Sequence, residues 1–309
     1  MFEITFLGTS ASAPSIRRGL PSQLIKHGEY RFLVDCGEGT QRQILKSGVG
    51  FKRLNRILIT HGHLDHILGL GGLLSTMLRW ESMDEIEICA GDSALERIID
   101  LVEKVVLRGA QEPIPIHYKQ IKPGLLFEAE DFTVSAFPVS HRGSGCFGFL
   151  FDEKGKRPFL PEKAEALEIP VGPWRRDLVN GQAVVLPDGR TIEPEMVLGE
   201  HRRGTRLVYI GDVGKTEELV EICRDADMLV IEATYLDSER DMARKFGHLT
   251  ALEAGKLAAA AGVKQLVLTH ISRRYREKDI LQEALSVFEA SSIAHDFDVL
   301  QIKHAESDS

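Results

Sequence analysis

The chain of 309 residues is acidic, with 38 basic and 46 acidic side chains and a formal net charge of −8. Apolar residues make up 43% and charged residues 27%, a composition typical of a soluble globular protein, which excludes collagen-like, coiled-coil and disordered classes. The acidic balance argues against a protein that coats nucleic acid indiscriminately, because that requires a broadly basic surface. A nucleic-acid enzyme that concentrates its basic residues locally stays open.

Several features predict a cytoplasmic protein without membrane contact. The opening segment MFEITFLGTS has an acidic residue at position 3 and is typical of a strand rather than an export signal. The longest apolar stretch, around 67–78, is interrupted by glycines and polar residues and is far shorter than the roughly 20 residues that span a bilayer. The four cysteines lie far apart without a CxxC pair, which indicates reduced thiols.

Short β-rich runs alternate with helical patterns along the chain, which predicts a layered α/β fold. Strands are expected at 2–7, 32–34, 57–60, 85–89, 132–137, 207–210, 228–231 and 265–269. Apolar residues at helical spacing predict a helix over 92–108, with Gly109 as its C-cap. A second helix is expected over Thr250–Ala261, because a capping box with Glu253 opens it and Gly262 closes it.

The segment 152–206 differs in composition from the rest of the chain, since it holds six of the twelve prolines. Within it, Pro187–Arg190 lies between apolar residues and predicts a short hairpin around an Asp-Gly turn. Loops of this length without a role are uncommon, so an insertion is favoured over a solvated connector. We therefore expect one domain over residues 1–309 that carries an insertion at 152–206.

The strongest chemical signal is the run THGHLDH at 60–66, which follows an apolar strand and precedes a helix-like pattern at 67–80. It places three histidines and an aspartate within six residues: His61, His63, Asp65 and His66. Imidazole and carboxylate are the ligands that zinc prefers in mixed sites. The chain has only 11 histidines, so a polar loop rich in histidine by chance is the weaker interpretation.

Polar residues at four other strand ends could complete a metal site: His141, Asp212, Glu232 and His270. Ligands and catalytic groups of layered α/β proteins gather where strands end. Each residue alone is more often a capped or core-facing side chain, but together they supply what one turn lacks. Seven likely ligands among these eight candidates are too many for one tetrahedral zinc and fit two metals.

This pattern resembles the metallo-β-lactamase fold, and more specifically the ribonuclease Z family in its short form. The similarity runs essentially end to end, from FLGTSASAP through VDCGEGTQRQI, THGHLDH and GDVG to IEATYLD, GHLT and LTHISRRY. The segment IPVGPW at 169–174 resembles the Gly-Pro motif of that family's tRNA-binding arm, at Gly172 and Pro173. The resemblance implies a four-layer αββα sandwich with 152–206 as an inserted, protruding tRNA-binding arm.

The resemblance also implies two Zn²⁺ per chain, with Mn²⁺ as an alternative metal. The implied ligands are His61, His63 and His141 for the first, Asp65, His66 and His270 for the second, and Asp212 as the bridge. Asp65 is also the implied acceptor of the attacking water's proton. Glu232 and His248 are the implied dyad that protonates the departing ribose 3′ oxygen, and Asp35 is implied as a partner that orients a ligand.

The chain departs from the family pattern at three places. Ile231 replaces a histidine beside Glu232, and because neighbours on a strand point to opposite faces, we expect Ile231 to pack in the core. Leu249 replaces a serine after His248. In the loop Pro14–Gly19, which inspects the tRNA end in this family, Arg17 and Arg18 are the implied substrate contacts, while Ile16 and Gly19 replace lysine and asparagine.

These features predict a zinc-dependent endoribonuclease that removes the 3′ trailer of precursor tRNA, leaving a 3′-hydroxyl on the tRNA and a 5′-phosphate on the trailer. The resemblance implies a homodimer in which one arm clamps tRNA for the other subunit's site. One alternative is a small-molecule phosphodiesterase or thioester hydrolase of the same fold, to which the insertion would be of no use. A metal-free scaffold is another, against which the full set of candidate ligands argues.

Overall fold

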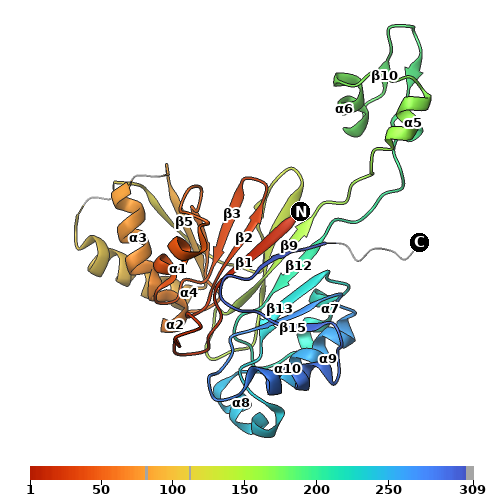
Figure 1. The fold of residues 1–309 in the computed structure, drawn as a ribbon. Coiled ribbons are helices and arrows are strands. Elements are labelled where there is room, and N and C mark those ends of the chain that lie inside the picture. The colour runs from red at the N-terminus through yellow and green to blue at the C-terminus, as the bar shows by residue number, and fades with distance from the viewer. Residues whose placement is uncertain (81–82, 111–112, 304–309) are drawn as a thin grey trace. The chain divides into compact units, whose positions relative to one another are not determined.

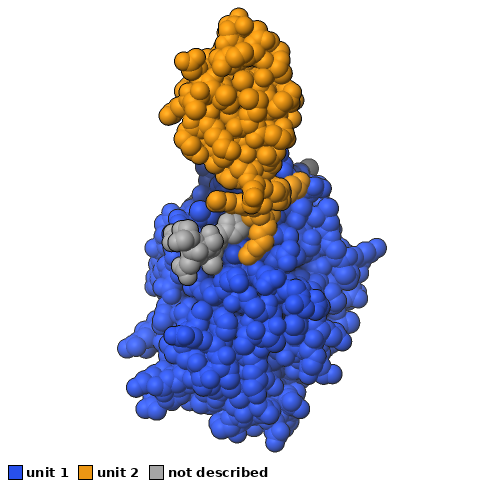
Figure 2. All heavy atoms as spheres, turned by 90° about the vertical axis from the view of Figure 1, so that its right-hand side faces the viewer, with its two compact units in different colours: residues 1–152, 205–309 blue, residues 153–204 orange. Residues whose placement is uncertain are grey.

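The computed structural model describes residues 1–80, 83–110 and 113–303. The chain forms two compact units, one of Met1–Asp152 and Thr205–Ser309 and the other of Glu153–Gly204 (Figure 2). Within the described ranges, none of the helices is both long and apolar enough to cross a bilayer.

Two seven-stranded mixed sheets form the centre of the first unit (Figure 1). The first sheet has the order β16-β1-β2-β3-β4-β5-β6, and the second has the order β15-β14-β13-β12-β9-β8-β7. The strands of the first are β1 Phe2–Gly8, β2 Ser22–His27, β3 Tyr30–Val34, β4 Arg56–Leu58, β5 Ile86–Ala90, β6 Ile116–Gln120 and β16 Val299–Gln301. Those of the second are β7 Gly124–Glu128, β8 Phe132–Pro138, β9 Phe147–Glu153, β12 Arg206–Tyr209, β13 Met228–Glu232, β14 Leu266–Thr269 and β15 Ser291–Ile293.

Helices cover the outer face of each sheet. On the first sheet lie α1 Thr40–Ser47, α3 Gly69–Trp80, α4 Asp92–Ile99 and the π-helix η1 Asp100–Leu107; α2 Leu64–Ile67 precedes α3. On the second sheet lie α7 Val220–Cys223, α9 Ala251–Ala261 and α10 Glu277–Leu285. The short helices η3 Glu217–Leu219, η4 Asp237–Glu239 and α8 Arg240–Phe246 connect this side of the unit.

Alternation along the strands sends apolar side chains into three cores. Phe6 and Phe32 pack between the two sheets, whereas Leu7 and Leu33 pack under the helices of the first sheet. Ile231 is fully buried under the helices of the second sheet, as expected. One core between the sheets and one under each helical layer produce the four-layer αββα arrangement, which confirms the predicted fold class.

The two predicted helices fare differently. The N-cap Thr250 accepts from the backbone of Glu253 in a complete capping box, and Gly262 closes α9 in the left-handed conformation, so this prediction is confirmed. The pattern at 92–108 instead continues from α4 into a π-helix, and Arg108 rather than Gly109 is the C-cap, with φ 50°. The wider π-type hydrogen bond from Arg108 N to Glu103 O, 3.0 Å long, ends the helix one residue early.

The second unit has its own small core. Its elements are α5 Pro161–Ala166, α6 Pro173–Val179, β10 Val184–Val185, β11 Thr191–Ile192 and η2 Pro194–Met196. The predicted hairpin is present as β10 and β11, and Leu178, Val184 and Val197 are buried together within the unit. Asp152 and Arg206, the predicted bounds of the insertion, are paired residues of β9 and β12, and their side chains form an ion pair of 3.0 Å.

Candidate metal centre and active site

All seven predicted metal ligands converge at one place in the first unit. They come from the turn after β4, from α2, and from positions within three residues of the ends of β8, β12 and β14. Three groups have ligand atoms within 4.8 Å of one another: His61, His63, His141 and Asp212; Asp65, His66 and His270; and Asp212, His248 and His270. Asp212 belongs to the first and third groups, and its Oδ1 also lies 3.4 Å from Nε2 of His66 in the second, so its carboxylate faces the ligands of both proposed metals.

In the first group the ring nitrogens face one another. Nδ1 of His63 lies 2.9 Å from Nε2 of His61 and 3.3 Å from Nε2 of His141. Oδ2 of Asp212 lies 3.6 Å from Nε2 of His61. Burial lowers the pKa of all three histidines, so each ring stays neutral and offers a lone pair. A shared cation accounts for nitrogens that point at each other in this way.

The second group leaves buried polar atoms unsatisfied. Oδ1 of Asp212 lies 3.4 Å from Nε2 of His66 and 3.2 Å from Nε2 of His270. Among the described residues these three buried atoms have no hydrogen-bond partner. An unpartnered buried polar atom costs about 1–3 kcal/mol, so the arrangement is unfavourable unless a ligand satisfies it. Together with the facing nitrogens of the first group, this shows that the residues fit a metal centre.

The charge state of Asp212 suits a cation. Burial alone would raise the pKa of its carboxyl, but His270, His66 and His61 hold that pKa well below its usual range. Burial also acts to raise the pKa of Asp65, but the neighbouring His270 and His66 lower it below its usual range. Both carboxylates are therefore ionised at neutral pH.

Each orienting contact to a histidine uses the nitrogen that faces away from the centre. Nδ1 of His66 donates to Asp35 Oδ2 over 2.8 Å, and Nδ1 of His141 donates to the Gly247 carbonyl over 2.6 Å. Nδ1 of His270 lies 2.9 Å from the Thr234 hydroxyl. Such partners fix the tautomer and ring orientation of a ligating histidine.

The backbone is held in an unfavourable conformation at two of these positions. Asp35 has φ 58° and His270 has φ 55°, in the left-handed region that non-glycine residues rarely adopt. Asp35 is secured there because its Oδ1 accepts from the Thr60 backbone over 2.8 Å and its Oδ2 accepts from the Thr60 hydroxyl over 2.9 Å. The surrounding polar contacts therefore stabilise conformations that the chain would otherwise avoid.

Glu232 and His248 form a buried dyad beside Asp212. Nδ1 of His248 lies 3.0 Å and 3.1 Å from the two carboxylate oxygens of Glu232, which also accepts from the Val213 backbone over 2.7 Å and from Thr234. Burial alone would lower the pKa of His248, but the charge and hydrogen bond of Glu232 raise it to about 9. The imidazole is therefore protonated at neutral pH and able to donate a proton.

The predicted substrate-binding residues are not members of the ligand groups. Arg17 is exposed, but Arg18 is buried, and its guanidinium donates to the Ala294 carbonyl over 2.6 Å and pairs with Glu277 at 2.8 Å. Arg18 thus anchors its loop and is not accessible to a substrate in this conformation. Gly172 and Pro173 lie in the second unit, where Gly172 has φ 136° and precedes α6.

The sequence did not predict three residues that contact the proposed metal ligands or the Glu232–His248 dyad. The backbone of Ser12 donates to Asp65 Oδ2 over 3.1 Å, Thr234 contacts both Glu232 and His270, and the Gly247 carbonyl holds His141. Thr234 follows Glu232 by two residues on the same strand end, and this spacing is the one local signal that could have identified it. Backbone groups such as those of Ser12 and Gly247 leave no trace in residue identity.

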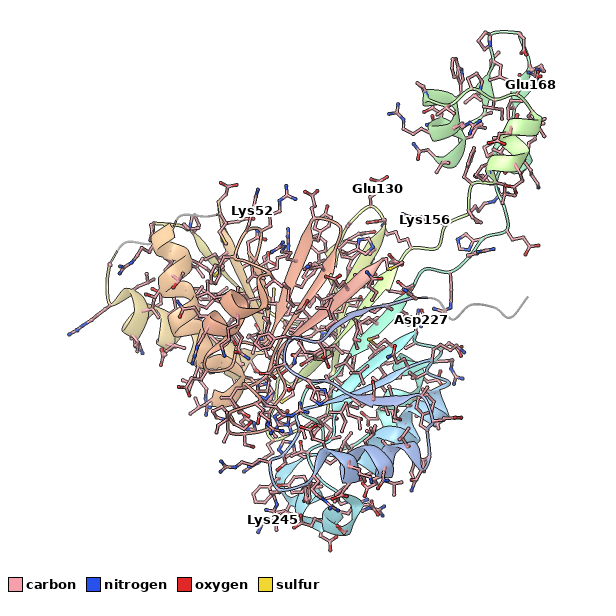
Figure 3. The ribbon with its side chains drawn as sticks, in the orientation of Figure 1. Lys52, Glu130, Lys156, Glu168, Asp227 and Lys245 are labelled. Atoms are coloured by element: carbon pink, nitrogen blue, oxygen red, sulfur yellow. The ribbon has the colours of Figure 1, made fainter. Side chains whose placement is uncertain are left out.

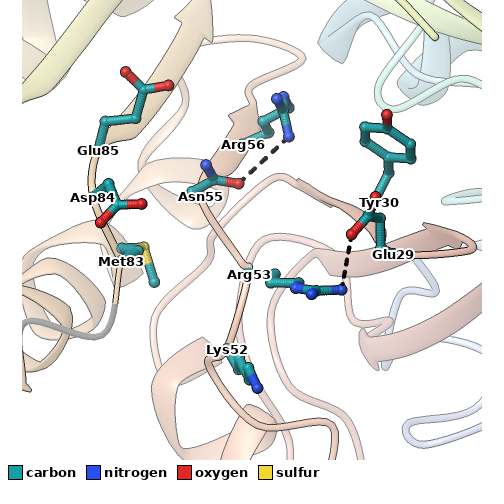
Figure 4. A pocket seen from close by; sticks show the side chains of 9 residues that line it. All are labelled: Glu29, Tyr30, Lys52, Arg53, Asn55, Arg56, Met83, Asp84 and Glu85. Atoms are coloured by element: carbon teal, nitrogen blue, oxygen red, sulfur yellow. Dashed lines mark hydrogen bonds and ion pairs between the residues drawn. The ribbon is translucent and has the colours of Figure 1, made fainter.

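A second charged hollow lies at the other end of β4. It measures about 340 Å³, and Lys52, Arg53, Arg56, Glu29 and Glu85 are among its lining residues (Figure 4). Arg53 pairs with Glu29 at 3.0 Å, and Arg56 lies over the Phe127 ring at 4.6 Å. Figure 3 shows Lys52 and Lys245 at opposite ends of the first unit.

Comparisons with known proteins agree with this fold and site. A family model described as "Anti-Pycsar protein Apyc1" matches residues 2–157, and one described as "Beta-lactamase superfamily domain" matches 192–271. The crystal structure of human tRNase Z, short form, superposes with a TM-score of 0.68 at 28% identity, covering 97% of this chain and 99% of that one. The fold and the histidine and aspartate groups therefore define a protein of the metallo-β-lactamase superfamily.

Curated relatives narrow the class. Ribonuclease Z of Bradyrhizobium diazoefficiens is 49% identical over 96% of this chain and 99% of its own length. Ribonuclease Z of Archaeoglobus fulgidus is 42% identical over 99% of this chain and 100% of its own length. The chain belongs to the ribonuclease Z family.

Proposed function

We propose that the protein is a zinc-dependent endoribonuclease that removes the 3′ trailer from precursor tRNA. The products are a 3′-hydroxyl on the tRNA and a 5′-phosphate on the trailer. The observation that carries the proposal is the Asp212 carboxylate, which lies next to the Glu232–His248 dyad and faces both sets of proposed ligands. Its Oδ2 lies 3.6 Å from Nε2 of His61, and its Oδ1 lies 3.2 Å from Nε2 of His270. Membership of the ribonuclease Z family supports the choice of substrate.

The chain's own residues divide into metal holders and proton carriers. His61, His63 and His141 would hold one cation, Asp65, His66 and His270 a second, and Asp212 both. Two bound Zn²⁺ ions, or Mn²⁺ in their place, would activate water and stabilise negative charge on the phosphoryl oxygens. Asp65, ionised and oriented by the Ser12 backbone, takes the proton of the attacking water.

His248 supplies the other proton. Its Nδ1 is fixed by Glu232, so its Nε2 carries the proton that passes to the departing ribose 3′ oxygen. A pKa of about 9 keeps that proton in place at neutral pH until the leaving oxygen needs it. Glu232, fully buried, stabilises the charged ring before the transfer.

The second unit, with Gly172 and Pro173, is proposed to bind the body of the tRNA. The segment 152–206 carries ten basic and ten acidic residues, so it lacks the negative excess of the rest of the chain and repels a polyanion less. The solvent-exposed Arg17 is a further proposed contact. We also propose a cytoplasmic homodimer, in which the second unit of one subunit serves the metal centre of the other.

The test is incubation of the purified protein with a precursor tRNA, followed by mapping of both new ends. We expect one cut at the 3′ side of the tRNA body, with a 3′-hydroxyl on the tRNA fragment. Chelation should abolish cleavage, and Zn²⁺ or Mn²⁺ added back should restore it. An intact tRNA together with hydrolysis of a small phosphodiester or thioester would overturn the proposal in favour of a small-molecule hydrolase.

A further inference from the structure

Two cations flank a half-buried aromatic ring at the end of α8. The guanidinium carbon of Arg142 lies 6.0 Å from the centroid of the Phe246 ring, and Nζ of Lys245 lies 5.7 Å from it. Arg142 and Lys245 are exposed, whereas Phe246 is half-buried. The three residues come from two segments far apart in the chain, and we call them the Phe246 cluster.

The Phe246 cluster adjoins the metal centre through Gly247. The Gly247 carbonyl accepts from His141, and a Cβ added to Gly247 would lie 3.1 Å from Cγ of Arg142 and 3.2 Å from Nδ1 of His141. Gly247 has φ 71°, so the chain reverses directly after Phe246 and delivers His248 to Glu232. The cluster therefore lies on the side of the metal centre from which His248 acts.

Both cations keep their charge available. Within residues 1–80, 83–110 and 113–303, neither the Arg142 nor the Lys245 side chain has a hydrogen bond or an ion pair, whereas the Arg244 side chain lies 4.0 Å from Glu253. A cation–π contact with one phenylalanine contributes about 0.5–1 kcal/mol at an exposed site, so it stabilises two unpaired charges placed together only weakly. In a chain of net charge −8, two unneutralised cations at the edge of the centre favour an anionic ligand.

We propose that the Phe246 cluster binds the RNA backbone phosphate one nucleotide to the 5′ side of the scissile phosphate. This inference rests on the proposed function, in which His248 protonates the 3′ oxygen of the last tRNA nucleotide and so lies on the tRNA side of the cut. Arg142 and Lys245 contact the phosphate, and Phe246 holds the two side chains beside each other. Exposed cations next to an aromatic ring are the combination with which proteins hold single-stranded RNA.

Salt dependence of binding tests the cluster. Arg142→Ala and Lys245→Ala should each reduce the slope of log affinity for precursor tRNA against log salt by about one, because each removes one phosphate contact. Each should also lose about tenfold more of kcat/KM on precursor tRNA than on a small bis-aryl phosphodiester. Lys52→Ala, an exposed lysine at the opposite end of the unit, is the matched control and should behave as the wild type.

A modified substrate locates the contact. A precursor tRNA with a neutral methylphosphonate at the proposed phosphate should bind the wild type more weakly, and Arg142→Ala should then add no further loss. Wild-type salt slopes in both variants, or full additivity with the methylphosphonate, would overturn the inference while the wild type still cuts precursor tRNA. Failure of the wild type to cut precursor tRNA would overturn the proposed function and this inference together. Metal content and Tm of each variant exclude misfolding as the cause.

Discussion

The two ends of β4 carry similar side chains in opposite circumstances. At one end, His61, Asp65 and Asp212 belong to a cluster whose ligand atoms face inward, and some of its buried atoms have no hydrogen-bond partner in the part of the chain that the structure describes. At the other end, Arg53 and Glu29 pair on the surface with more than half of each side chain exposed (Figure 4). The difference teaches that polar residues identify a site when burial leaves them unsatisfied, and not when water and ion pairs already satisfy them.

Residue composition alone would not have separated the two ends. Both hold titratable groups at strand termini, and the hollow at the second end has the volume of a small-ligand site. The first end shows strongly displaced pKa values, among them the raised pKa of His248 and the lowered pKa of Asp212. Displaced titration reflects desolvated charges held close together, which is what catalysis requires.

Removal of Asp212 is the largest expected perturbation. Asp212→Ala should abolish turnover, because the Asp212 carboxylate faces the ligands of both proposed metals. Elemental analysis should find the wild type with two metals per chain and the variant with fewer. Substantial activity in the variant, or no more than one metal in replete wild type, would contradict the two-metal proposal.

Removal of His248 separates proton transfer from metal binding. His248→Ala should keep both metals while the chemical rate falls by roughly 10²–10⁴, the usual contribution of a positioned general acid. Nδ1 of His248 lies 3.9 Å from Asp212 Oδ2, so a ligand role is the competing interpretation. Loss of metal from the variant would establish that role instead.

Removal of the second unit tests remote binding. A chain in which a short linker replaces 153–204 keeps the paired strand ends Asp152 and Arg206. The KM for precursor tRNA should rise by about 100-fold or more, while cleavage of a bis-aryl phosphodiester stays near the wild-type rate, the pattern of lost remote binding energy. Equal losses on both substrates would mean that the segment supports the first unit.

The ion pair between Arg18 and Glu277, which anchors the loop Pro14–Gly19, should have a smaller, pH-dependent effect on stability. Burial alone would raise the pKa of Glu277, but hydrogen bonds from Arg18 and His295 hold it below its usual value. Its contribution to stability is therefore present above the pKa of the unfolded chain and is lost as the pH falls through the folded-state pKa. Glu277→Gln should lower Tm at neutral pH, and thermal denaturation should show the difference shrinking as the pH falls below the usual pKa of a glutamate. A difference that persists in acid would assign the effect to packing.

The exposed pair at the second end of β4 should matter least. Arg53→Ala should leave both turnover and Tm within experimental error of the wild type, because an exposed ion pair contributes little. Steady-state kinetics and thermal denaturation check this. A clear loss of turnover would break the comparison between the two ends and make the hollow a functional site.

The sequence predicted the site better than the contacts around it. The motif THGHLDH could be recognised as a metal site because its four candidate ligands lie close together in the chain and follow a strand that the apolar pattern predicts. The strand Ser22–His27 was missed because nearly all of it is buried, so it lacks the alternation that marks a half-exposed strand. Arg18 was expected as a substrate contact, and its burial could not be foreseen because its partner Glu277 is 259 positions away and no local pattern records such a pair.

Because Asp152 and Arg206 form an ion pair where the two strands end, the inserted unit can be exchanged for another without disturbing the sheet. They are paired across β9 and β12, so the second sheet requires only that these two strand ends lie next to each other. The segment that connects them does not take part in the sheet. The entropy of closing a loop grows only with the logarithm of its length, so exchanging one insert for a longer or shorter one changes little in the stability of the sheet. Evolution can therefore exchange the proposed RNA-binding unit as a whole, and with it the choice of substrate, while the metal centre of the first unit is inherited unchanged.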